Sequence, residues 1–286
     1  MSPSTKYPFS VKDLSFEDYV ELRRLHLIIS TIYNGKGYAG LFKFFRQSEL
    51  DVFLLLEGML QNFSLAPITV RESVADFEKE TRDELWDSEE ELRTFYSDDH
   101  NYDLLVSGDL GANLLQKYVA AFLMEASDDW LGYSFTVAKG IVEKELGDDE
   151  SMRKLENIER YSGARTRNIF SENRLDVIPS ISLEYDVEAW IMDENSKLIG
   201  EFQFQEPRRA RFLFTREQHA LMEDYIQRFG NTHQGIGKIL TKMNINSVWR
   251  RCVYSDEAKW AEDEDGPEIH YSLIDEQASG GVVSTR

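Results

Sequence analysis

A glycine-rich segment near the N-terminus has the spacing of a phosphate-binding loop. Gly35, Gly37 and Gly40 fit the pattern G-x-G-x-x-G. In dinucleotide-binding folds such glycines follow a strand and let the backbone approach a pyrophosphate at the start of a helix. The apolar run before Gly35 extends back to a capped start at Ser15 and contains charged residues, which favours a helix. We therefore expect a helix–glycine–helix corner, with nucleotide or small-molecule binding at this loop as the alternative.

Carboxylates gather in a second segment, where they are expected to share one face of a predicted hairpin. These residues are Glu184, Asp186, Glu188 and Glu201. Grouped carboxylates can bind a hard cation or transfer protons. No histidine or Gly/Asp loop joins them, so a solvated face paired with nearby arginines is the favoured interpretation. No histidine pair has zinc-ligand spacing, and no metal site is predicted.

The chain has one cysteine, Cys252, which directly follows Arg250 and Arg251. Nearby cations lower the pKa of a thiol, but strand alternation places Arg251 on the opposite face from Cys252. A single cysteine excludes a disulfide framework, a zinc ribbon and a self-contained iron–sulfur cluster. We assign no catalytic residue, expect no cofactor, and expect the chain not to act as an enzyme on its own.

Arginines concentrate on or beside one predicted strand, in a chain whose net charge is −20. Arg208, Arg209 and Arg211 are the candidate partner-binding residues. Two acidic segments, 71–100 and 256–276, each have a net charge of −8. The arginines either pair with these segments of the same chain or form a contact surface for an acidic protein partner. The acidic balance argues against nucleic-acid binding, because a phosphate backbone would be repelled.

Hydrophobic periodicity places seven or eight helices in the first 170 residues or so. The first runs from 15 to 33, with Leu22 and Ile29 on its apolar stripe. From residue 181 to 192 the period changes to alternation, which indicates a strand with one solvated face. Further strands are predicted at 198–205, 210–214 and 247–254, and helices at 215–229 and 233–243. The predicted fold is mainly α with an α+β C-terminal part.

Four regions are predicted along the chain. They are an N-terminal arm at 1–14, a helical region at 15–172, a small antiparallel sheet with two helices at 173–256, and an acidic, disordered tail at 257–286. No apolar stretch approaches the length of a membrane span, and no secretory signal is recognised. With its lone cysteine, the chain is expected in the cytoplasm.

Two stretches resemble the region that follows the catalytic barrel in cobalamin-binding radical SAM proteins. Residues 23–35, Arg-Arg-Leu-His-Leu-Ile-Ile-Ser-Thr-Ile-Tyr-Asn-Gly, resemble a long helix that ends before a short aromatic helix, here at 41–45. Residues 229–240, with Trp249 and the two arginines after it, resemble the tail of such enzymes. The three-cysteine cluster motif and the D-x-H-x-x-G cobalamin motif of that family are missing here. The resemblance therefore implies a non-catalytic accessory protein, a detached C-terminal module whose partner is another protein, such as a radical SAM/cobalamin enzyme.

Overall fold

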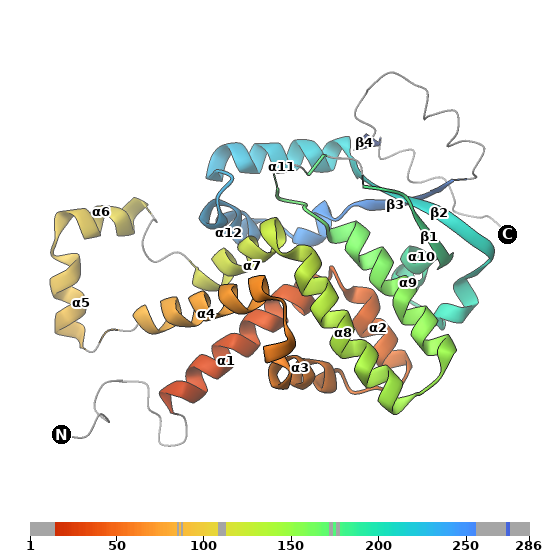
Figure 1. The fold of residues 1–286 in the computed structure, drawn as a ribbon. Helices are drawn as coiled ribbons and strands as arrows, with labels where there is room; N and C mark the ends of the chain where they lie inside the picture. The colour runs from red at the N-terminus through yellow and green to blue at the C-terminus, as the bar shows by residue number, and fades with distance from the viewer. Residues whose placement is uncertain are drawn as a thin grey trace.

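Helices form most of the chain in the computed structural model, which describes residues 15–84, 86, 88–107, 113–171, 174–175, 178–255 and 273–274. Within these residues, twelve α-helices accompany a small antiparallel sheet that lies near the C-terminal end (Figure 1). The predicted class, mainly α with an α+β C-terminal part, is confirmed. The predicted arm at 1–14 lies outside the described residues. Of the predicted tail at 257–286, only a two-residue strand is described.

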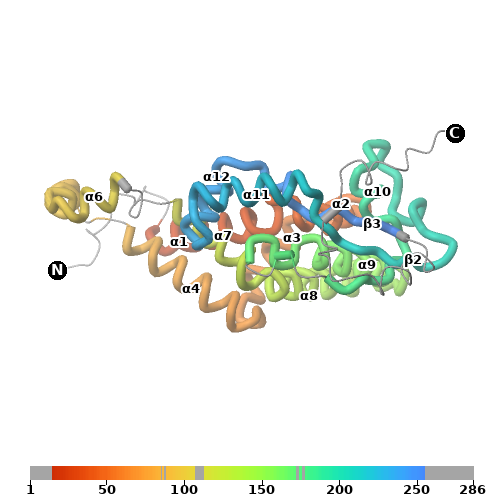
Figure 2. The backbone as a smooth tube through the Cα atoms, turned by 90° about the horizontal axis from the view of Figure 1, so that it is seen from above, coloured from red at the N-terminus to blue at the C-terminus, as the bar shows by residue number. Residues whose placement is uncertain are grey.

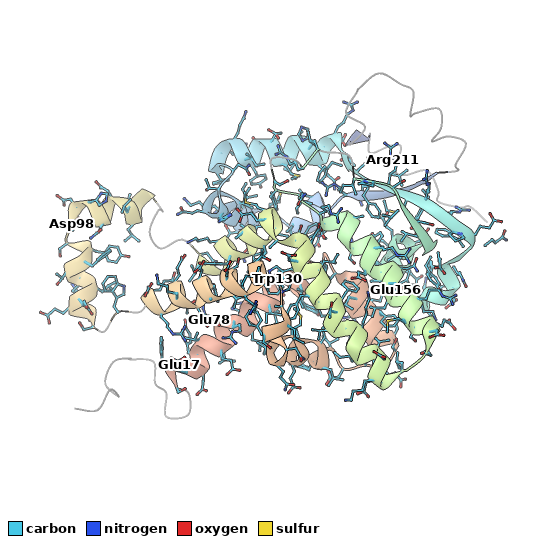
Figure 3. All side chains as sticks on the ribbon, in the orientation of Figure 1. Glu17, Glu78, Asp98, Trp130, Glu156 and Arg211 are labelled. Carbon is cyan, nitrogen blue, oxygen red and sulfur yellow. The ribbon has the colours of Figure 1, made fainter. Side chains whose placement is uncertain are left out.

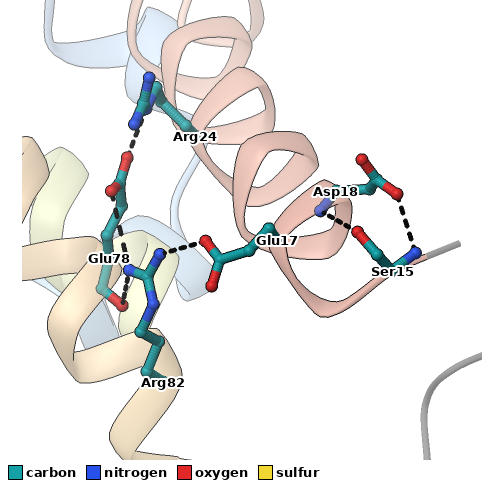
Figure 4. A network of polar contacts seen from close by, with 6 residues as sticks. All are labelled: Ser15, Glu17, Asp18, Arg24, Glu78 and Arg82. Carbon is teal, nitrogen blue, oxygen red and sulfur yellow. Dashed lines mark hydrogen bonds and ion pairs between the residues drawn. The ribbon is translucent and has the colours of Figure 1, made fainter. Parts of the chain in front are cut away.

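The first helix, α1 (Phe16–Ile29), begins at a reciprocal capping box. The Ser15 hydroxyl accepts from the backbone N–H of Asp18, and the Asp18 carboxylate accepts from the backbone N–H of Ser15 (Figure 4). The helix continues as a π-helix, Ser30–Asn34, up to the glycine corner. Leu22 is 51% exposed, so its predicted place in the core is wrong, whereas Ile29 is half-buried.

The next helices build the body around α1. They are α2 (Ala39–Gln47), α3 (Val52–Gln61), a 3-10 turn (Phe63–Leu65) and α4 (Ile68–Asp83). Ion pairs join α1 to α4, where Arg24 contacts Glu78, and Arg82 lies 2.8 Å from Glu17 (Figure 4). These pairs fix the crossing of two helices that also share buried apolar side chains.

Two short helices, α5 (Glu89–Tyr96) and α6 (Asp99–Ser107), stand away from this body (Figures 1 and 2). The chain then returns through α7 (Leu114–Glu125), α8 (Ser127–Glu145) and α9 (Asp149–Thr166). Asn113 caps α7, because its side chain accepts from the N–H of Gln116. The core centres on residues such as Trp130, which is fully buried (Figure 3).

Three strands form the antiparallel sheet in the order β1 (Ile181–Tyr185), β2 (Gln203–Thr215) and β3 (Arg251–Ser255). A fourth strand, β4 (Leu273–Ile274), pairs in parallel with the end of β2. The inner face of the sheet is buried against α9, where the ring of Tyr161 meets that of Phe212 with 5.5 Å between centroids. The helices α11 (Arg216–Phe229) and α12 (His233–Lys242) connect β2 to β3 through a 3-10 turn (Ile245–Val248).

The strands differ from the predicted ones in three places. The strand predicted at 181–192 ends at Tyr185 and gives way to α10 (Val187–Met192), because the Asp186 side chain accepts from the N–H of Ala189 and caps a helix. The strands predicted at 198–205 and 210–214 are one strand, β2, preceded by a 3-10 turn (Ile199–Phe202). The last strand begins at Arg251 rather than at residue 247.

Candidate interaction surface

The three candidate arginines all lie in β2, between β1 and β3. Arg209 is opposite Ser182 of β1 and Ser255 of β3, while Arg211 is opposite Val253. Alternate residues of a strand point to opposite faces, so Arg209 and Arg211 share the face that Phe212 does not occupy. Since Phe212 packs on α9, the arginines lie on the outer face of the sheet, and Arg211 is seen there in Figure 3.

The expected set of three arginines lies only partly on that face. By strand alternation, Arg208 points to the other face of the sheet from Arg209 and Arg211. Its guanidinium lies 4.8 Å from the centroid of the Phe204 ring. Arg251 of β3 takes the place of Arg208, because it is paired with Leu213, two residues along β2 from Arg211. Side chains of directly paired residues share a face. We call Arg209, Arg211 and Arg251 the outer arginine face.

The outer arginine face is accessible and rich in positive charge. Arg209 and Arg251 are exposed, and Arg211 is half-buried. By strand alternation, no acidic residue of the described strands β2 and β3 points to this face, and in β1 only Glu184 does. A guanidinium presents its donors in a planar fork that matches a carboxylate. Three such groups on adjacent strands form a surface suited to carboxylates.

The described acidic residues of segment 71–100 are not placed at this face. In α4, Glu80 lies 2.7 Å from Lys117 of α7, and Glu78 contacts Arg24. The helices α5 and α6, with Asp98 between them, stand at the opposite end of the molecule from β2 (Figures 1 to 3). Segment 256–276 falls outside the described residues, apart from Leu273 and Ile274 of β4. The ion pairs of Glu78 and Glu80 thus join α4 to α1 and to α7, and not to the sheet.

The glycine loop has a packing role. A helix, not a strand, leads into Gly35, and α2 begins at Ala39. A Cβ atom at Gly37 would lie 2.9 Å from Thr166 Cγ2 and 3.3 Å from the Trp249 ring. Atoms of other side chains therefore occupy the space that a pyrophosphate would need beside this glycine. The predicted helix–glycine–helix corner is confirmed, and the strand that the nucleotide alternative requires is replaced by a helix.

The four predicted carboxylates are dispersed rather than gathered on one face. Glu184 lies in β1, Asp186 caps α10, and Glu201 accepts from the N–H of Leu198 at 3.0 Å. Glu188 lies in α10, where its Oε2 accepts from the N–H of Cys252 at 3.2 Å. The expectation of a shared face is wrong because the chain changes from strand to helix after Asp186. Among the described residues, no group of three or more His, Cys, Asp or Glu side chains could hold a metal ion.

Cys252 lies in a partly buried polar cluster that the sequence did not indicate. The cluster comprises Tyr161, Arg165, Glu188, Cys252 and Tyr254. Burial raises the pKa of the Cys252 thiol well above its usual value, and the nearby Glu188 adds to this effect. Burial also raises the pKa of the Glu188 carboxyl. Both effects disfavour the thiolate, which is the nucleophilic form of cysteine.

The two arginines before Cys252 do not activate its thiol. Arg251 points to the outer face, as alternation predicts, and the guanidinium of Arg250 lies 4.4 Å from the centroid of the Phe214 ring. Members of the cluster come from α9, α10 and β3, and no motif in the sequence joins these elements. The pairing of Cys252 with Phe212, which packs on Tyr161, brings β3 to α9, and the hydrogen bond from the N–H of Cys252 to Glu188 joins β3 to α10.

In the part of the chain that the structure describes, no helix is long and apolar enough to span a membrane. No family model, curated protein or solved structure matches the chain.

Proposed function

We propose that this chain is a non-catalytic interaction protein that binds an acidic segment of another protein on its outer arginine face. The observation that supports this proposal is the placement of three guanidinium groups on one outer face of the sheet, with Arg209 and Arg251 exposed. The acidic helices α5 and α6 lie at the far end of the molecule from this face (Figure 1).

The attraction must act at short range, because the chain as a whole is acidic. Its net charge of −20 repels an acidic partner at long distance. At physiological ionic strength that repulsion is screened beyond about 8 Å, so the local arginines dominate once the partner is close. Single exposed ion pairs contribute only about 0–1 kcal/mol each, and binding therefore depends on several pairs formed together. We expect binding that weakens steeply with added salt.

Replacing the outer arginine face by Arg209→Ser, Arg211→Ser and Arg251→Ser tests this proposal. The probe is a fluorescein-labelled peptide of alternating Glu and Gly, titrated by fluorescence anisotropy at low and high salt. The matched control, Arg71→Ser, Lys144→Ser and Lys242→Ser, removes the same three charges from exposed positions on other elements. We expect the face variant to lose binding and the control to retain it. Equal losses would show that net charge alone governs binding and would contradict the proposal.

We further propose that the natural partner belongs to a cobalamin-binding radical SAM system in the cytoplasm. The two stretches that carry the resemblance contact each other, since the Trp249 indole N–H donates to the Gly35 carbonyl at 2.8 Å. Co-expression with such an enzyme from the same host, followed by affinity purification, tests this pairing. Co-purification that the face variant abolishes would support it. Peptide binding without co-purification would reject this partner but keep the interaction surface, and duplex DNA should not bind.

A further inference from the structure

The helix α6 presents an exposed face on which carboxylates and apolar side chains lie together. Residues three and four positions apart share one side of a helix, so Asp99, Tyr102, Asp103 and Val106 form one stripe along α6. All four residues are exposed, and Tyr102 and Val106 are 54% and 69% accessible to solvent. We call these four residues the α6 face.

The position of α6 makes this face available to another molecule. The helices α5 and α6 stand away from the body, and none of their described residues belongs to the hydrophobic core (Figures 1 and 2). The rings of Trp86, Phe95 and Tyr96 pack on one another beside α5, whereas Leu105 of α6 is exposed like the α6 face. Helices of eight and nine residues are marginally stable by themselves, and apolar side chains gathered on an exposed element indicate a surface for another chain.

The charge of these two helices favours a basic surface as their partner. Residues 88–107 contain six acidic residues and one basic residue, Arg93. The Arg93 guanidinium lies 2.7 Å from a carboxylate oxygen of Glu89 in the same helix, so its charge is compensated locally. The outer arginine face has the opposite charge and lies at the other end of the molecule (Figure 3). A contact between the two surfaces therefore joins two copies of the chain.

The spacing of the charged groups is similar on the two surfaces. Asp99 and Asp103 are four positions apart in α6, which places their Cβ atoms about 6 Å apart. Arg209 and Arg211 are two positions apart in β2, a separation of about 7 Å along the strand. Each carboxylate can thus meet one guanidinium at the same time as the other. Val253, which is half-buried and paired with Arg211, offers an apolar contact beside these arginines.

We propose that the α6 face of one copy docks on the outer arginine face of a second copy. This inference rests on the proposed function, because it names an occupant of the same basic surface. The contact is small, since α6 has nine residues and is about 14 Å long. Contacts that bury less than about 1,200 Å² are typically weak and transient. A second copy and a partner protein cannot occupy the face together, so self-association competes with partner binding.

Two complementary variants test this contact by analytical ultracentrifugation at physiological ionic strength. The α6 variant combines Asp99→Asn with Asp103→Asn, and the face variant is the triple arginine replacement given above. We expect the weight-average mass of the unmodified protein to rise about twofold or more as its concentration approaches about 100 µM, whereas each variant alone stays monomeric. An equimolar mixture of the two variants should again reach about twice the monomer mass, because one variant supplies an intact α6 face and the other an intact outer arginine face.

A matched control removes an exposed acidic pair with the same spacing from another helix. Glu72→Gln with Asp76→Asn does so in α4 and should associate like the unmodified protein. A monomeric unmodified protein, association that the α6 variant retains, or a mixture that stays monomeric would overturn the inference. Titration of the α6 variant with the Glu/Gly peptide separates the two proposals. Peptide binding without self-association of the unmodified protein would reject only the second copy as occupant, whereas loss of peptide binding would reject the face itself.

Discussion

Two leucines of α1 allow core burial to be separated from helix formation. Leu27 is fully buried and Leu22 is 51% exposed, although both lie within the same helix. The change to alanine has the same effect on helix propensity at both positions. Three carbon atoms are lost from Leu27, which at about 0.8 kcal/mol per buried methylene removes about 2.4 kcal/mol of transfer free energy. The cavity that remains adds to this, so we expect Leu27→Ala to lower the free energy of unfolding by about 3–5 kcal/mol.

Leu22→Ala should cost much less, about 1 kcal/mol or below, because half of the side chain already contacts water and no closed cavity forms. Urea unfolding followed by circular dichroism and by tryptophan fluorescence gives both values by linear extrapolation. The apolar stripe alone predicted that Leu22 is as costly to truncate as a core residue. If both variants lost the same free energy of unfolding, with the same dependence of that free energy on urea concentration, the packing of α1 described above would be refuted.

Three further predictions concern Glu188, Arg250 and the lone cysteine. Burial raises the pKa of Glu188 above its value in the unfolded chain, so ionisation of this group destabilises the fold as pH rises. Glu188→Gln can still accept from the N–H of Cys252 and should unfold at higher urea than the unmodified protein at about pH 8, but not at about pH 4; equal differences at both pH values would contradict this. Arg250 is buried and donates to the carbonyls of Arg167 and, at 2.8 Å, of Arg174. Arg250→Lys loses one of these hydrogen bonds and should lower the free energy of unfolding by about 1–3 kcal/mol in the same urea assay. An unchanged urea midpoint would show that these two hydrogen bonds do not stabilise the fold. Reconstitution with iron and sulfide should give no stoichiometric absorbance at about 400 nm, because a cluster needs several thiolates and the chain has only Cys252.

Helix starts could be predicted from the sequence because their signals are local. The capping boxes at Ser15 and at Thr215 involve residues only three positions apart, and both form as expected. Asp148 likewise accepts from the N–H of Ser151 at the start of α9. Hydrogen bonds of this kind depend on neighbours in the sequence and hardly on the rest of the fold.

The segment after Tyr185 could not be predicted, because its apolar residues fit two periods. Val187 and Trp190 are three positions apart, as in a helix, yet the same segment also alternates as in a strand. Contacts with α2 favour the helix, since the Trp190 indole donates to Gln47 and the Lys43 amine donates to the Asp193 carbonyl at 3.0 Å. Both partners are more than 140 positions away in the sequence.

The continuity of β2 has a similar explanation. Pro207 lies between the two predicted strands, and proline cannot donate a hydrogen bond to a neighbouring strand. In the structure the register of β1 against β2 shifts between Leu183 and Tyr185, which are paired with Arg208 and Gln203. The extra residues of β2 at this irregularity include Pro207, and such bulges tolerate proline.

The composition of the outer arginine face depends on strand register, which the sequence does not provide. Arg250 and Arg251 are adjacent, yet one is buried against Phe214 and the other is exposed beside Arg211. The pairing of Cys252 with Phe212 determines which of the two arginines lies on the outer face. A shift of β3 by one residue would move Arg251 to the inner face and Cys252 to the outer one. The apolar packing of Phe212 on α9 therefore determines which arginines lie on the outer face, and the same packing places Cys252 on the inner face.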